Sequence, residues 1–209
     1  MILLMAFAAF GAAASAGAQG PPAASSIPQS EGAYRLPYAD GAQAKVFDDF
    51  ESHRPRGRVD LFAVGGEPPY RVVAAAAGRI VAIQDGHGEQ QTGRAAAVCR
   101  NNYVWIAHPN GEWTTYSHLA QGSVTGGAGL SVGDSVDQGQ AIGVEGTVGC
   151  SMLNHVHFEV ARPQAGAGID VLGFLLDNDD GQRLRNPRFC GVEDGTARRD
   201  RIYTAQPCD

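Results

Sequence analysis

The chain has 209 residues, of which 18% are charged, and its formal net charge is −6 at pH 7. This length fits one domain with extensions and a sizeable hydrophobic core. The negative net charge, with Lys45 as the only lysine, argues against nucleic acid as a partner.

The N-terminal residues predict a targeting segment. Residues 1–18 are apolar and end in small residues, with Ala-x-Ala-type cleavage sites at Ala14–Ala16 and Ala16–Ala18. The run Ile2–Ala14 is too short for a comfortable membrane span. We therefore expect a signal peptide, and no stable membrane insertion once it is cleaved; a retained anchor is the minor alternative. The mature protein is expected in the periplasm, at the cell surface or outside the cell.

The middle of the chain predicts an all-β domain. Residues 19–33 are rich in Pro, Ala and Ser and predict a linker. From Tyr34 onward, short β-prone segments recur between Gly, Asn and Asp turns, and no segment shows a convincing helical period. Strands are expected at 35–38, 45–47, 59–64, 71–74, 78–83, 103–108 and 112–119. The Asn110-Gly111 pair predicts a hairpin between the last two. We assign residues 34–165 to one mainly antiparallel domain.

The last part of the chain differs in composition. Residues 166–180 are rich in Gly and Asp, and residues 183–209 are rich in Arg. We expect residues 166–209 to form an irregular, disulfide-stapled extension. It would cap the domain edge or add to a substrate groove.

Four cysteines remain in the mature chain. An even number in an exported protein predicts two disulfides, and spacing other than Cys-x-x-Cys argues against a thiolate zinc cluster. The sequence allows three pairings. We favour Cys99–Cys150 and Cys190–Cys208.

Two histidines share one face of a predicted strand. The segment 155–160 alternates, so His155, His157 and Glu159 point to one side and three apolar residues point to the other. Two neighbouring imidazoles on a strand with an apolar back can bind a metal ion. The alternative is a pair of surface histidines on an exposed sheet.

Four segments resemble those of the lysostaphin-type (LytM-like) zinc metallopeptidases, which are peptidoglycan endopeptidases, and they follow one another in the same order as in that family. Residues 155–160, His-Val-His-Phe-Glu-Val, resemble the H-x-H-F-E signature of that family. Residues 59–63 resemble its aspartate strand, 116–119 its central histidine segment, and 133–143 its glycine-punctuated hairpin. The resemblance covers about residues 36–162. It implies a duplicated-hybrid-motif-like fold in which antiparallel sheets form a groove.

The resemblance also implies roles for single residues. Asp60 and His157 match two ligands of a Zn²⁺ ion, and His118 and His155 match the two catalytic histidines. Glu159 would support the site without binding the metal. Bound zinc lowers the pKa of a water molecule to near 7, and the two histidines would orient that water and stabilise the transition state.

The third ligand departs from the family pattern. The common histidine, four residues before the aspartate, is replaced by Arg56, which cannot bind zinc. We expect a wider loop to return His53 to the metal, because Pro55 and Gly57 allow an irregular path. His87 is a poorer substitute, and His108 reads as a strand-end residue.

We therefore expect a monomeric zinc metalloendopeptidase that hydrolyses peptide bonds in peptidoglycan cross-links or stem peptides. Peptidoglycan peptides would be its partners, and a regulatory protein partner stays open. The alternative, if His53 does not reach the metal, is a non-catalytic module that binds the cell wall or regulates other hydrolases.

Overall fold

The computed structural model describes residues 27–88, 99–176 and 182–209. The expected signal peptide, residues 1–18, lies outside the described residues. No helix in the described part of the chain is long and apolar enough to cross a membrane.

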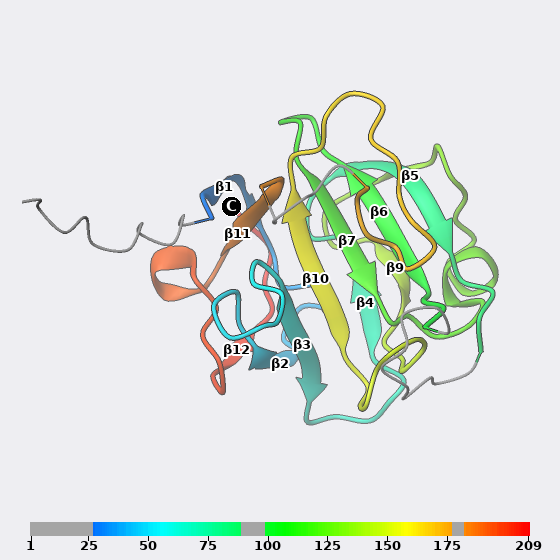
Figure 1. Ribbon diagram of the computed structural model, residues 1–209. Helices are drawn as coiled ribbons and strands as arrows, with labels where there is room; N and C mark the ends of the chain where they lie inside the picture. The colour runs from blue at the N-terminus through cyan, green and yellow to red at the C-terminus, as the bar shows by residue number, and fades with distance from the viewer. Residues whose placement is uncertain (1–26, 89–98, 177–181) are drawn as a thin grey trace, which may run out of the picture.

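Strands make up almost all regular structure in the described residues, which confirms the all-β prediction (Figure 1). Helical structure there is limited to a π turn at Ser123–Gly127 and a 3-10 turn at Glu193–Gly195. The strands in chain order are β1 (Gln29–Tyr34), β2 (Gln43–Asp48), β3 (Val59–Val64), β4 (Arg71–Val73), β5 (Gly78–Gln84), β6 (Tyr103–Ala107), β7 (Trp113–Ser117), β8 (Ser135–Val136), β9 (Ala141–Val144), β10 (Val156–Ala161), β11 (Leu184–Phe189) and β12 (Ile202–Thr204).

The described strands form a large sheet of ten and a small sheet of two. The path of the large sheet is β12-β2-β3-β10-β7-β6-β5-β8, with β11 branching from β10 and β1 added to β11. The small sheet pairs β4 with β9. Every pairing between the described strands is antiparallel except the parallel pair of β1 and β11, so the prediction of mainly antiparallel sheets is confirmed.

The main core lies on one face of the large sheet, where the small sheet packs against it. Val156, Phe158 and Val160 of β10 point into this core and are fully buried, as their alternation predicts. Val72 and Ile142 enter it from the small sheet. The opposite face of β10 is therefore left for His155, His157 and Glu159.

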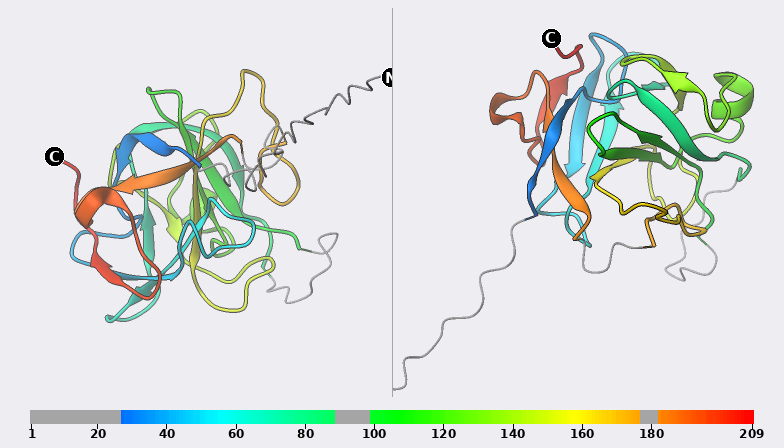
Figure 2. Two further views of the ribbon diagram at one scale, coloured as in Figure 1. Left: turned by 60° about the vertical axis from the view of Figure 1, so that its left-hand side comes forward. Right: turned by 90° about the horizontal axis from the view of Figure 1, so that it is seen from above.

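Three segments expected to be irregular form strands instead. Gln29–Tyr34 begins inside the expected linker, and Leu184–Phe189 and Ile202–Thr204 lie inside the expected extension. β1 and β11 pair with each other in parallel, β11 also pairs with β10, and β12 pairs with β2, so both ends of the described chain join the large sheet (Figure 2). The linker prediction is wrong for this part, because pairing across some 150 positions leaves no local signal.

Both favoured disulfides are present. Cys99 is bonded to Cys150, and Cys190 is bonded to Cys208. The first joins the segment before β6 to the loop before β10. The second ties the end of β11 to the C-terminus.

Candidate metal centre

Strand register places Asp60 directly beside His157. In the antiparallel pair of β3 and β10, Asp60 lies opposite His157, and cross-strand partners point their side chains to the same face. The distance from Oδ1 of Asp60 to Nδ1 of His157 is 3.0 Å. Both residues are buried, with exposed fractions of 7% and 5%.

The loop between β2 and β3 returns His53 to this pair. A backbone hydrogen bond from Gly57 to Phe50 closes the loop at 3.0 Å, and Gly57 takes a φ of 95° that favours glycine. The Nε2 atom of His53 then lies 3.4 Å from Oδ2 of Asp60. Arg56, which stands at the common histidine position, is ion-paired with Glu51.

The donor set fits a zinc ion. One ligand atom each from His53, Asp60 and His157 lie within 4.8 Å of one another. Each imidazole has its other nitrogen near an oxygen acceptor: Nδ1 of His53 is 2.8 Å from the Pro55 carbonyl, and Nε2 of His157 is 2.8 Å from Glu159. In the neutral form of each ring, a proton on Nδ1 of His53 and on Nε2 of His157 leaves a lone pair on Nε2 of His53 and on Nδ1 of His157, the nitrogens that face Asp60. Two imidazole nitrogens and a carboxylate, each oriented by a further acceptor, are what zinc prefers.

Opposite charges dominate the electrostatics of the buried cluster. Burial raises the pKa of Asp60, but the hydrogen bond and charge of His157 outweigh it and hold that pKa well below its usual range. Burial lowers the pKa of His157, but the carboxylates of Asp60 and Glu159 outweigh it and raise the pKa to about 9. The pKa of Glu159 is lowered: burial opposes this, and the His157 bond and the Arg58 charge prevail.

The other two candidate histidines lie next to this cluster. The rings of His118 and His155 are 4.6 Å apart, and Nε2 of His155 is 3.7 Å from Oδ1 of Asp60. Nδ1 of His118 lies 2.7 Å from the Val148 carbonyl, and Nδ1 of His155 lies 2.9 Å from the Leu153 carbonyl. Both rings therefore have Nδ1 as the donor and Nε2 as the free acceptor.

Burial keeps these two imidazoles neutral. Desolvation, with the nearby charges of His155 and His157, lowers the pKa of His118 to about 3. Desolvation is also the largest cause of the lowered pKa of His155. Two neutral imidazoles with free Nε2 atoms can accept a proton beside the metal centre.

Sequence reasoning missed three residues around the cluster. Phe174 packs edge-on against the His157 ring at 5.9 Å, and the Arg58 guanidinium lies 4.9 Å above the Phe174 ring. Asn101 accepts a 3.1 Å hydrogen bond from the backbone of His118. Arg58 lies two residues before Asp60 and Asn101 two residues after Cys99 in the sequence, but neither spacing predicts these contacts.

The two remaining histidines, His87 and His108, do not belong to the group formed by His53, Asp60 and His157. Both ring nitrogens of His108 have partners, the Ala77 carbonyl and the Thr114 hydroxyl, each at 2.9 Å. His87 lines a different hollow, beside Arg100.

Solved structures give distant matches. The structure of pseudoalterin, an M23 metalloprotease from the deep sea, matches with 17% identity and a TM-score of 0.47, covering 85% of this chain and 98% of that one. The catalytic domain of lysostaphin from Staphylococcus simulans matches with 23% identity and a TM-score of 0.37, covering 62% and 80%. A zinc-containing peptidase from Vibrio cholerae matches with 22% identity and a TM-score of 0.42, covering 62% and 36%.

Among the matches, some chains are much longer than this one. The match spans 36% of the Vibrio cholerae chain and 48% of a Pseudomonas aeruginosa chain described as a peptidase M23.

No curated protein matches this sequence. The model of peptidase family M23 matches residues 54–170, which is more than half of the chain. The chain belongs to peptidase family M23.

Proposed function

We propose that this protein is an exported zinc endopeptidase that hydrolyses peptide bonds in peptidoglycan cross-links or stem peptides. The observation that carries the proposal is the buried cluster of His53, Asp60 and His157, with His118 and His155 beside it. Family membership supports peptidase chemistry. The two disulfides support an oxidising compartment outside the cytoplasm.

Zinc would be held by His53 through Nε2, by the Asp60 carboxylate and by His157 through Nδ1. When bound, it would lower the pKa of a coordinated water and polarise the scissile carbonyl. Glu159 keeps His157 in the required tautomer by accepting a hydrogen bond from Nε2.

His155 and His118 would act as the proton acceptors and donors of the reaction. Each imidazole is neutral and holds its Nδ1 proton on a backbone carbonyl, so Nε2 can accept the proton of the attacking water. The imidazolium that forms can donate to the developing oxyanion or return the proton to the leaving amine. Carbonyl anchors fix both rings, so little reorganisation is needed during the reaction.

A hollow of about 600 Å³ beside the metal centre gives a peptide room to bind. His53, His118, His157 and Phe174 are among the residues that line it. The size is in the range of small-ligand sites.

The non-catalytic alternative depends on His53 lying away from the metal. The 3.4 Å distance from its Nε2 atom to Asp60 favours the enzyme.

The test is release of new amino groups from purified peptidoglycan by the zinc-loaded protein. We expect release by the wild type, and loss of activity with retention of zinc in His118→Ala and His155→Ala. Zinc-loaded wild type that releases no amino groups would contradict the proposal and favour a wall-binding module. Loss of zinc from either variant would reassign the ligands.

A further inference from the structure

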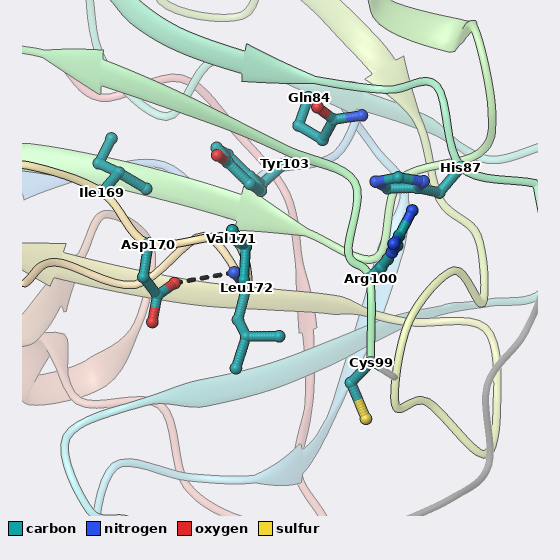
Figure 3. A pocket seen from close by; sticks show the side chains of 9 residues that line it. All are labelled: Gln84, His87, Cys99, Arg100, Tyr103, Ile169, Asp170, Val171 and Leu172. Atoms are coloured by element: carbon teal, nitrogen blue, oxygen red, sulfur yellow. Dashed lines mark hydrogen bonds between the residues drawn. The ribbon is translucent and has the colours of Figure 1, made fainter. Parts of the chain in front are cut away.

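The Cys99–Cys150 disulfide borders the metal centre. Both cysteines line the hollow beside the metal centre, which gives a peptide room to bind. Cys99 also lines the separate hollow of His87 and Arg100, and Figure 3 shows its side chain pointing away from theirs. The disulfide therefore forms part of the wall of the proposed substrate site.

The two segments that this disulfide joins both hold His118. On the Cys99 side, Oδ1 of the buried Asn101 accepts a 3.1 Å hydrogen bond from the backbone N–H of His118. On the Cys150 side, the Val148 carbonyl accepts a 2.7 Å hydrogen bond from Nδ1 of the His118 ring. One segment thus fixes the backbone of His118, and the other fixes its ring.

His118 depends on this support because of its backbone conformation. Its φ is 66°, in the left-handed region that residues other than glycine rarely adopt. Such a conformation persists only where the surrounding contacts impose it. The two segments also touch each other, since a Cβ atom on Gly149 would lie 3.1 Å from Oδ1 of Asn101. Separating the segments would therefore let His118 relax.

The loop that begins at Cys150 also orients His155. Ser151 is buried, and its Oγ lies 2.6 Å from the Leu153 carbonyl and 3.1 Å from Nδ1 of His155. The Leu153 carbonyl itself lies 2.9 Å from the same Nδ1. One disulfide thus stands behind both proposed catalytic histidines.

Other elements position the three proposed metal ligands. His53 lies in the loop between β2 and β3, which a backbone hydrogen bond closes, and Asp60 lies on β3. His157 lies on β10, which pairs with β3 on one side and with β7 on the other. Opening the Cys99–Cys150 link is therefore expected to disturb the catalytic pair and to leave the ligands in place.

We propose that the Cys99–Cys150 disulfide positions His118 and His155, so that the protein hydrolyses peptides only in the oxidised form and binds zinc in both forms. The inference rests on the proposed peptidase function and deepens it, because it names how the site is regulated. Hydrolysis would begin only where the chain meets a compartment that oxidises the two thiols.

Reduction would enter at Cys150, which is exposed, whereas Cys99 is buried. A thiolate of a dithiol attacks Sγ of Cys150, the S–S bond breaks, and Cys99 leaves as a thiolate that takes up a proton. The second thiol of the reductant then attacks the mixed disulfide and frees Cys150. The cystine gains two electrons and two protons, and the dithiol becomes a disulfide.

The test uses two variants that each keep one disulfide. Cys99→Ser/Cys150→Ser lacks the proposed positioning disulfide. Cys190→Ser/Cys208→Ser is the matched control, because the disulfide that it lacks ties the end of β11 to the C-terminus. The control is measured oxidised, reduced by a phosphine and reoxidised. A phosphine replaces the dithiol because thiolates bind zinc.

Four properties are measured on each form beside the wild type. They are the zinc content, the far-UV circular dichroism, the release of amino groups from peptidoglycan, and the NMR signals of isotope-labelled histidine rings. The ring signals report the tautomer of each histidine without any need for activity.

We expect one zinc per chain and an unchanged β spectrum in every form. Release should fall about 10-fold to 100-fold in Cys99→Ser/Cys150→Ser and in the reduced control, as the loss of one or two hydrogen bonds predicts, and should return on reoxidation. In the same samples, His118 and His155 should lose their single Nδ1–H tautomer.

Unchanged release in both forms that lack the positioning disulfide would overturn the proposal. Loss of zinc or of the β spectrum together with activity would also overturn it, because the disulfide would then only staple the fold. If one variant does not fold, the other decides by the same criteria. If the wild type releases no amino groups, the peptidase proposal fails, and the ring signals alone decide the positioning role.

Discussion

Oε1 of Glu159 lies 2.8 Å from Nε2 of His157, on the side of the ring that faces away from Asp60. The same carboxylate oxygen accepts a 2.6 Å hydrogen bond from Arg58. This buried chain of charges orients the His157 ring and increases the basicity of Nδ1. The H-x-H-x-E pattern thus places the proposed metal ligand and the carboxylate that supports it on one strand.

Glu159→Gln should weaken zinc binding without unfolding the protein. The amide keeps an acceptor but removes the charge that supports His157, so we expect about 10-fold to 100-fold weaker zinc affinity. Competition with a chromogenic chelator measures it. The control is Glu193→Gln, an exposed glutamate in the 3-10 turn. Equal affinities in the two variants would mean that the contact does not support the metal.

Asn101→Ala should lower turnover while zinc stays bound. Asn101 holds the backbone of His118, which has a φ of 66°, a strained value for a residue other than glycine. Without that bond His118 can relax away from the reacting atoms, and we expect kcat to fall about tenfold, the value of one hydrogen bond.

Metal analysis beside steady-state kinetics separates positioning from a general loss of structure. Gln43→Ala, at an exposed position of β2, serves as the control. Unchanged kcat in Asn101→Ala would show that His118 is fixed by its Val148 contact alone.

The metal-free protein should be most stable near pH 6.5. The pKa of His157 is raised to about 9 in the folded state, so its contribution to the free energy of unfolding is full below pH 6.5 and is lost as the pH rises through 9. The pKa of His118 is lowered to about 3, so folding becomes less favourable as the pH falls below 6.5. Urea unfolding in chelator across pH 5–9 measures both slopes. In His157→Gln the loss above pH 6.5 should disappear, and its persistence would contradict the assignment.

Glu112→Ala should destabilise the fold and detach β1. This fully buried carboxylate accepts hydrogen bonds from the backbone of Glu31 and Gly32, from the Tyr34 hydroxyl and from the Asn110 amide, all between 2.8 and 3.0 Å. Removing it leaves several donors without their acceptor, and we expect a loss of about 3–5 kcal/mol in the free energy of unfolding.

Urea denaturation measures the loss in Glu112→Ala, and proteolysis near β1 reports its detachment. Asp137→Ala, at an exposed position, is the control. A loss below about 1 kcal/mol would mean that water replaces the carboxylate.

The parts of the fold that the sequence predicts are those with local periodicity. The alternation at 155–160 places the two histidines on one face and three apolar residues in the core, as the structure has them. The Asn110-Gly111 turn joins β6 to β7. Both disulfide pairs also agree with the prediction.

Long-range contacts escaped prediction because they leave no periodic signal. Leu184–Phe189 contains Pro187 and three polar residues, and it is a strand only because β1 and β10 pair with it. Phe174 reaches His157 through a glycine-rich loop whose path depends on Asp170 and Trp105. The roles of the site residues remain predictions.

The zinc content of the purified wild type, His53→Ala and His87→Ala tests the central claim most directly. His53 and His87 both lie in loops, but only His53 approaches Asp60, at 3.4 Å. We predict one zinc per chain in the wild type and in His87→Ala, and loss of zinc in His53→Ala. Zinc retained in His53→Ala, or little zinc in the wild type, would contradict the three-ligand site.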